Sequence, residues 1–357
     1  MKLSILSSIA LGFLLACSSA DAAPSKRVVG GILADSTLPA LIPDRTSPAT
    51  NVPDVSQDAE ANALSHNGPL PAGVQTKGGF ALDLTNVTVP VSGTLSRVSL
   101  PLATTAKITI LKTYFSLSDS AYCDSVTVNG KWTCNTCLPS YTLVKTFSTS
   151  SDVTGYIARN DKTKEIELVY RGSGSIDNWI TNLKFVRKDY PPVSGASVHI
   201  GFYDAYIESQ SIVLTYIRAQ LTSYPSYRVV VTGHSLGGAI APIAALDLYQ
   251  RDSRFTNQNL FIYTYGGPRI GNDEFAYYLT STGITYERTV NNRDIVVHLP
   301  PQSVGYLHAG VEYWITSDTS VVKICDGTLD SDNCSNSIVP FTSVSDHTSY
   351  FDIERVC

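Results

Sequence analysis

The sequence is poor in charge and contains no run of basic residues. Charged residues make up 16% of the 357 residues, and 26 Lys and Arg stand against 31 Asp and Glu, a net charge of −5. Nucleic acids and anionic membrane surfaces recruit clustered basic side chains, so neither is expected as a partner. Beyond the first 22 residues the chain also lacks an apolar run long enough to span a bilayer.

Residues 1–22 have the pattern of a secretory signal. Lys2 supplies a positive start, an apolar run follows, and the small residues around Asp21 form a cleavage pattern. We therefore expect a secreted, extracellular protein.

Residues 23–94 lack aromatic side chains apart from Phe80 and are rich in Pro, Ala, Ser, Thr, Asn and Asp. Such a composition buries too little apolar surface to offset the entropy of ordering. We expect a pro-segment that is removed, with a retained linker as the alternative; the boundary near residue 94 is approximate.

Residues 95–357 alternate between predicted strands and helices. Strands are expected at 166–170, 227–232, 260–265 and 286–290, and amphipathic or buried helices at 202–221 and 236–249. This order predicts a single α/β domain of the α/β-hydrolase type, with a mostly parallel central sheet and helices on both faces. Active sites of such sheets lie at the carboxyl ends of the strands.

The motif Gly233-His234-Ser235-Leu236-Gly237 follows a run of three valines and precedes a helical segment. A serine on this sharp strand-to-helix turn is exposed as a nucleophile, and the Leu236 N–H points at a developing oxyanion. The pattern predicts a serine hydrolase with Ser235 as its nucleophile.

A serine nucleophile needs a histidine base and an acid that orients the base. The order Ser, acid, His leaves His298, His308 and His347 as bases, and the order favours His347 near the C-terminus. Asp294 follows a predicted strand and is a candidate acid, with rivals at three other positions: Asp273, Asp318 and Asp326.

The segment after the strand at 166–170 carries a candidate second oxyanion donor, Ser173, in a glycine- and serine-rich turn. Ile176, Trp179 and Ile180 then share one face of a short helix. That helix is either a lid with an apolar face toward lipid or a packed core segment.

Six cysteines remain once Cys17 leaves with the signal, and an even number in a secreted chain indicates disulfides. Short loops make Cys134–Cys137 and Cys325–Cys334 plausible pairs, which leaves Cys123 to bond Cys357. A metal site at Cys134-x-x-Cys137 is the less favoured alternative. We expect no metal and no cofactor.

Together these motifs resemble the secreted fungal triacylglycerol lipases of the Rhizomucor and Rhizopus type, the class 3 lipases. The resemblance runs from about residue 107 to the C-terminus and is carried by five segments: Val169–Ser173, Val231–Ala239, Gly267–Asn272, Arg293–Val296 and Cys334–Phe341.

The resemblance implies a triad of Ser235, Asp294 and His347 and an oxyanion hole from Ser173 and Leu236. It also implies a mobile lid around 175–181, removal of the signal and pro-segment, and the three disulfides above. Three positions depart from the family pattern: Asn182 replaces an aspartate that holds the oxyanion residue, Asp177 replaces a lid arginine, and Val297 replaces a proline.

The expected function is hydrolysis of triacylglycerols at an oil–water interface through an acyl-enzyme on Ser235, by a lid-controlled monomer with no stable protein partner. One alternative is an esterase of the same fold acting on soluble or feruloyl esters, which a polar lid would favour. The other is a lipid-binding protein that keeps the fold without the chemistry.

Overall fold

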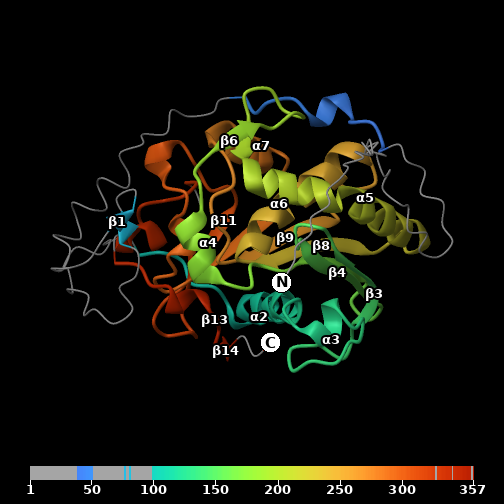
Figure 1. Ribbon diagram of the computed structural model, residues 1–357, viewed down its shortest axis with the longest axis horizontal. Helices are drawn as coiled ribbons and strands as arrows, with labels where there is room; N and C mark the ends of the chain where they lie inside the picture. The colour runs from blue at the N-terminus through green and yellow to red at the C-terminus, as the bar shows by residue number, and fades with distance from the viewer. Residues whose placement is uncertain are drawn as a thin grey trace, which may run out of the picture. The chain divides into compact units, whose positions relative to one another are not determined.

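A computed structural model describes residues 38–50, 76–77, 80–81, 99–325, 328–339, 341–354 and 357 (Figure 1). The predicted signal at 1–22 and most of the predicted pro-segment lie outside the described residues. The described residues all lie in one compact unit, Thr37–Cys357.

An eight-stranded sheet runs through this unit in the order β12-β11-β10-β9-β8-β5-β4-β3. The strands from β5 to β11 in this order pair in parallel, whereas β3, β4 and β12 are antiparallel to their neighbours at the two edges. The bounds are β3 Thr142–Ser148, β4 Thr154–Asn160, β5 Glu165–Tyr170, β8 Arg228–His234, β9 Leu260–Tyr265, β10 Thr285–Asn291, β11 Val311–Ile315 and β12 Val322–Cys325. The mostly parallel sheet predicted from the sequence is confirmed.

Helices cover both faces of the sheet, as predicted (Figure 1). Helices α5 (Ile200–Ser223) and α6 (Leu236–Arg251) pack on the face that carries Leu168 and Val231. Helix α2 (Thr105–Ser120) packs on the opposite face, against Val169 and Val230. Neighbouring strand residues enter different cores because side chains alternate between the two faces of a strand.

The predicted elements at 166–170, 202–221, 227–232, 236–249, 260–265 and 286–290 all form, with ends displaced by at most two residues. The remaining helices are α3 Asp124–Thr127, α4 Ile176–Asn182 and α7 Asp273–Ser281. Short 3-10 turns occur at η1 Pro43–Arg45, η2 Val296–His298, η3 Gln302–Val304, η4 Ser335–Ile338 and η5 Ser345–His347. Small two-stranded ribbons pair β1 (Thr76–Lys77) with β2 (Phe80–Ala81), β6 (Arg187–Asp189) with β7 (Ser197–His199), and β13 (Ser349–Tyr350) with β14 (Ile353–Glu354).

Three disulfides join the six cysteines in the predicted pairing: Cys123–Cys357, Cys134–Cys137 and Cys325–Cys334. The first connects the segment after α2 to the end of the chain across 234 residues. Such a long closed loop removes much of the conformational freedom of the unfolded chain. The metal alternative at Cys134-x-x-Cys137 is wrong, because these sulfurs are bonded to each other.

Residues 38–50 belong to the segment whose composition predicts poor packing, yet they contact the domain. The backbone N–H of Ile42 donates to the carbonyl of Gln250 at 2.8 Å, and Arg45 donates to carbonyls in the last turn of α6 and just beyond it. Polar contacts hold this part of the chain, which an argument from apolar surface alone does not detect.

Candidate active site

The turn between β8 and α6 places Ser235 in an uncommon backbone conformation, with φ 59° and ψ −128°. A side chain at Gly233 would lie 2.4 Å from the backbone of Gly237, and one at Gly237 would lie 2.3 Å from the carbonyl of Tyr170. Both glycines of the motif are therefore required by close backbone approach, as the strand-turn-helix pattern predicts.

Asp294 and His347 come together at the carboxyl edge of the sheet. Asp294 follows β10 and is fully buried, and His347 ends η5 near the C-terminus. Their side chains meet at 2.8 Å, from His347 Nδ1 to Asp294 Oδ2. Burial alone would raise the pKa of Asp294, but the electrostatic interaction with His347 and hydrogen bonds from His347, Tyr350 and Val296 hold it below its ordinary value.

The other two candidate bases have different partners. His298 Nδ1 faces the Asn336 side chain at 3.1 Å, and His308 Nε2 faces the carbonyl of Val297 at 2.7 Å. Burial lowers the pKa of His298 to about 4. Both histidines are buried and neither is hydrogen-bonded to Asp294, although His298 Nε2 is also buried without a hydrogen-bond partner.

The structure also shows the positions of two of the three rival acids. Asp273 stands in the first turn of α7, and exposed Asp318 accepts hydrogen bonds from the backbone and hydroxyl of Ser320. Asp326 lies outside the described residues. The first two are turn and helix-start residues that do not meet a histidine.

Two atoms at this site, Ser235 Oγ and His347 Nε2, are buried without a hydrogen-bond partner. Ser235 is 2% exposed and His347 is 1% exposed. Buried polar atoms are usually satisfied in folded proteins, so unpartnered atoms beside the Asp294–His347 pair are free to bond an incoming group. In this conformation a substrate cannot reach the serine.

Helix α4 begins directly after the Ser173–Ser175 turn and turns its apolar face inward. Ile176 and Ile180 are buried in the core cluster that includes Phe202. The half-buried Trp179 ring lies nearly parallel to Phe202 at 6.3 Å. The predicted shared face of Ile176, Trp179 and Ile180 is confirmed.

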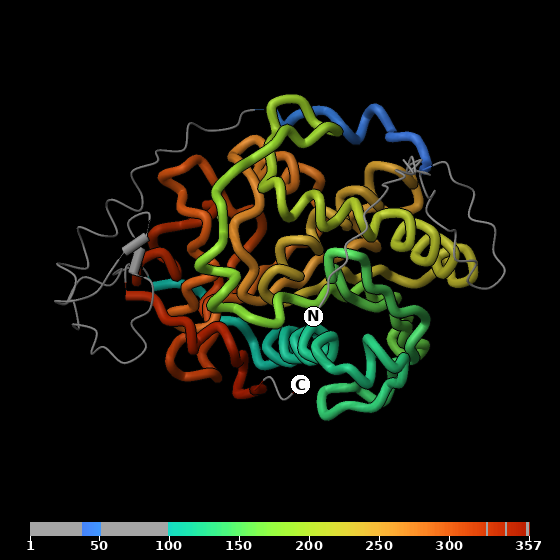
Figure 2. Tube along the Cα trace, viewed as in Figure 1, coloured from blue at the N-terminus to red at the C-terminus, as the bar shows by residue number. Residues whose placement is uncertain are grey.

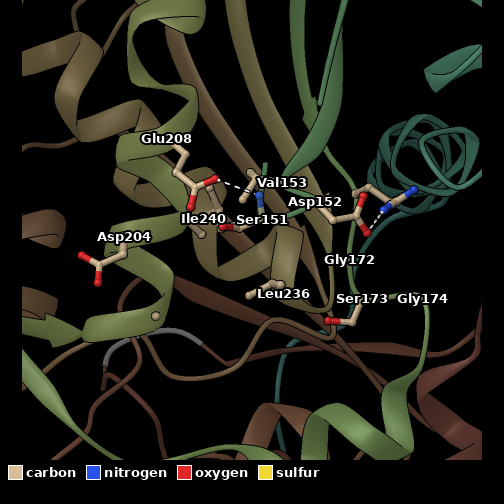
Figure 3. A pocket seen from close by; sticks show the side chains of 13 residues that line it. Ser151, Asp152, Val153, Gly172, Ser173, Gly174, Asp204, Glu208, Leu236 and Ile240 are labelled. Carbon is tan, nitrogen blue, oxygen red and sulfur yellow. Dashed lines mark hydrogen bonds and ion pairs between the residues drawn. The ribbon is translucent and has the colours of Figure 1, made fainter. Parts of the chain in front are cut away.

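Ser173 and Leu236 line one pocket of about 340 Å³ (Figure 3). Its walls also carry three carboxylates, Asp152, Asp204 and Glu208. Asp152 pairs with Arg171 at 2.6 Å, and Glu208 accepts from the Thr149 hydroxyl at 2.5 Å. The two predicted oxyanion donors therefore border a polar, acidic hollow.

The three departures from the family pattern have defined places. The side-chain amide of exposed Asn182 donates to the carbonyl of Asn178 at 2.8 Å, within α4. Asp177 is exposed on the same helix. Val297 is buried in η2, where its carbonyl meets His308. The hydrogen bond of the Asn182 side chain therefore links two residues of α4 and does not reach Ser173.

Sequence patterns did not single out several residues that surround the site. The Tyr350 hydroxyl donates to Asp294 Oδ2 at 2.5 Å. Gly266 has φ +58°, and a side chain there would lie 2.7 Å from the His347 ring. The available signals were weak: Tyr350 lies three residues after His347, and Gly266 directly follows a predicted strand.

A second arrangement missed by the motifs supports the backbone of His347. Nε2 of His234 lies 2.9 Å from the carbonyl of His347, and Nδ1 lies 2.8 Å from the Tyr122 hydroxyl. A carbonyl only accepts, so Nε2 carries a proton and Nδ1 of the neutral ring accepts from Tyr122. His234, the residue before Ser235, thus holds the loop that bears His347.

One group of potential metal ligands occurs among the described residues, Glu312 with Cys325 and Cys334. The two cysteines form a disulfide, so they present no thiolate to an ion.

Comparison with known proteins identifies the family. The chain is 48% identical to a lipase of Rhizomucor miehei over 351 residues, which cover 96% of each chain. The chain belongs to the class 3 lipase family. Residues 167–304 match the family's sequence pattern, and a lipase of Rhizopus niveus is 45% identical over 90% of this chain and 88% of its own.

Solved class 3 lipases share the fold described above. The native propeptide complex of Rhizomucor miehei lipase superimposes with a TM-score of 0.80 at 48% identity, covering 90% of this chain and 99% of that one. A triacylglycerol lipase whose catalytic centre is formed by a serine protease triad gives a TM-score of 0.70 at 51% identity, covering 72% and 98%. This class 3 lipase is accordingly a carboxylic ester hydrolase. Among its described helices, none is both long and apolar enough to cross a membrane.

Proposed function

We propose that this lipase hydrolyses triacylglycerols at an oil–water interface, with Ser235, Asp294 and His347 as its catalytic triad. The observation that carries the proposal is the Asp294–His347 contact of 2.8 Å beside two buried, unpartnered atoms, Ser235 Oγ and His347 Nε2. The substrate class is supported by relatives of known fold, one of which is a triacylglycerol lipase with a serine protease triad.

In the proposed reaction, Ser235 Oγ attacks the ester carbonyl while His347 Nε2 takes its proton. Asp294 keeps the proton of His347 on Nδ1 and stabilises the imidazolium that forms. The alcohol leaves with the proton from His347, which generates an acyl-serine. A water molecule, deprotonated by His347, then attacks the acyl group, and the fatty acid and free serine are released.

We propose that the backbone N–H groups of Ser173 and Leu236 stabilise the oxyanion of each tetrahedral intermediate. Leu236 is the first residue of α6, where N–H groups have no partner within the helix and the helix dipole favours negative charge. Both residues border the same pocket, which supports their acting on one oxygen.

We propose that α4 is a lid. Ile176 and Ile180 are buried in the apolar cluster against which Leu236 packs, and the neighbouring Ser235 is 2% exposed, which supports α4 as the element that moves to admit substrate. Movement in water would expose an apolar face, whereas at an oil surface that face is transferred to lipid. Contact with the interface therefore shifts the equilibrium toward the open enzyme.

Maturation and secretion complete the proposal. Residues 1–22 are a secretory signal, 23–94 a pro-segment with an approximate boundary, and 95–357 the catalytic domain. The three disulfides fit an oxidising, extracellular compartment. A propeptide complex is known for the Rhizomucor miehei relative.

The deciding experiment measures hydrolysis rate against tributyrin concentration through its solubility limit, for wild type and Ser235→Ala. We expect the wild-type rate to jump above the limit and the variant to be inactive at every concentration. Ordinary saturation below the limit would instead identify an esterase for soluble esters, and comparison with a feruloyl ester would test that alternative. Failure of a phosphonate ester to label Ser235 would leave only a lipid-binding role.

A further inference from the structure

The C-terminal end of α6 bears a cluster of contacts that the catalytic proposal does not use. The guanidinium of Arg45, from the N-terminal segment drawn in blue in Figure 2, reaches this end of the helix. Arg45 Nη1 donates to the carbonyls of Tyr249 at 2.6 Å, Phe255 at 2.7 Å and Asp252 at 3.3 Å. Arg45 Nη2 donates to the carbonyl of Ser253 at 3.3 Å.

We propose that the end of α6 is a binding site for an arginine-containing peptide segment, which residues 39–46 of this chain occupy in the precursor. The last carbonyls of a helix lack partners within it and carry partial negative charge. Arginine is suited to them because its planar guanidinium presents several N–H donors at once. The guanidinium carbon also lies 4.2 Å from the centroid of the Tyr249 ring, which adds a cation–π contact.

The site also binds the backbone of the segment. Ile42 N–H donates to the carbonyl of Gln250 at 2.8 Å, and Arg251 Nη1 donates to the carbonyl of Pro39 at 2.6 Å. The Tyr278 hydroxyl donates to the carbonyl of Arg45. These three contacts fix the position of the segment along the end of the helix. They place the side chain of Arg45, and not that of a neighbouring residue, next to the carbonyls at the end of α6.

The groups on the domain are held in place by buried partners. Gln250 is fully buried, and both ends of its side-chain amide are bonded. Nε2 donates to the Tyr278 hydroxyl at 2.7 Å, and Oε1 accepts from the Tyr190 hydroxyl at 2.9 Å. Because the Tyr278 oxygen already accepts from Gln250, its own hydrogen is directed to the segment. Arg251 is fixed in the same way by Asp247 at 2.6 Å. Preorganisation of this kind reduces the entropy lost on binding.

The binding site for the segment lies at the opposite end of α6 from Ser235. Ser235 precedes the first residue of α6, and the Arg45 contacts begin at its fourteenth residue, Tyr249, and continue past its end, a separation of roughly 21 Å or more at the rise of an α-helix. A segment bound there leaves the nucleophile unobstructed. The site therefore acts as an anchor that holds the N-terminal segment on the domain, including after the chain between them is cut.

The test uses the secreted chain with a specific protease recognition sequence inserted after Gly73, so that it does not depend on natural processing or on lipase activity. After cleavage, the two fragments are separated by size-exclusion chromatography. We expect the N-terminal fragment to elute with the domain in the wild type. Arg45→Ala and Arg45→Lys should weaken its retention by about tenfold or more, because several hydrogen bonds from a charged donor are lost.

The matched control is Asp44→Asn, which changes the exposed neighbour of Arg45 on the same turn and should leave retention unchanged. Adding a synthetic peptide of residues 38–47 to the cleaved wild type should displace the fragment, whereas the same peptide with alanine at position 45 should not. Immediate separation of the wild-type fragments, or equal retention and displacement with and without arginine, would overturn the proposal.

Discussion

The Tyr350 hydroxyl and His347 Nδ1 meet the same oxygen of Asp294, at 2.5 Å and 2.8 Å. Tyr350 is fully buried, and its pKa is raised well above the usual value by burial and by the Asp294 charge, so it remains a donor. Oδ2 of the carboxylate is thereby held by two donors, while the Val296 N–H donates to Oδ1 at 2.8 Å.

Tyr350→Phe should lower kcat about tenfold with little change in KM, because one charge-assisted hydrogen bond that orients Asp294 is lost. Steady-state kinetics on a soluble ester measures this. Tyr265→Phe is the matched control, since it removes a buried hydroxyl whose partner is the Leu111 carbonyl, at 2.6 Å. Equal losses of kcat in both variants would show a general packing effect and no special role for Tyr350.

Tyr122→Phe should also reduce kcat, by a factor of about ten, through the backbone of His347. The change removes the donor to His234 Nδ1, so the ring that bonds the His347 carbonyl is held less firmly. Kinetics on the same soluble ester provides the measurement. Tyr156→Phe, which removes a buried hydroxyl bonded to the Leu117 carbonyl, should keep wild-type kcat. An unchanged kcat for Tyr122→Phe would contradict this prediction.

Glu167, a buried residue in the core beneath α2, should make the stability of the fold depend on pH. Both carboxyl oxygens are buried without a partner. Burial, with the nearby Glu165 charge, raises its pKa well above the ordinary value of 4.5, although Arg228 acts in the opposite direction. The folded chain keeps a proton that the unfolded chain releases, so the unfolding free energy should fall as pH rises above about 4.5.

Glu167→Gln should remove this pH dependence, because glutamine does not titrate. Above about pH 4.5, the unfolding free energy of the variant should exceed that of the wild type by about 1.4 kcal/mol more for each pH unit. The increase should stop once the pH reaches the pKa of Glu167 in the folded chain. Denaturant unfolding between pH 5 and about pH 8 measures the difference. A difference in unfolding free energy between Glu167→Gln and the wild type that does not change with pH would show that Glu167 does not cause the pH dependence.

Ile180→Ser should open the proposed lid in water. The side chain is 6% exposed, and its removal from the apolar face of α4 should favour the open form by roughly tenfold, from the burial energy of one aliphatic side chain. The rate on dissolved tributyrin should rise and the jump at the solubility limit should shrink. Asn178→Ala, on the exposed face, should retain the wild-type jump. A lower rate below the limit for Ile180→Ser would argue that α4 only packs.

Local sequence determined the elements whose physics is local. Alternating and helical apolar patterns predicted the central strands and helices, and the glycines around Ser235 predicted a tight turn because side chains there collide with nearby backbone. The chain order of Ser235, Asp294 and His347 narrowed the candidates, but left three histidines and several aspartates open until the family resemblance was considered.

Only the tertiary structure decided which side chains meet. Asp294 and His347 are 53 residues apart, Tyr122 and His234 are 112 apart, and their contacts depend on how strands order in the sheet and where loops return to its edge. Arg45 lies 204 residues before Tyr249, in a segment whose composition argues against packing. Apolar periodicity reports which face of an element is buried, whereas polar partnerships depend on atoms that long-range folding brings within hydrogen-bonding distance.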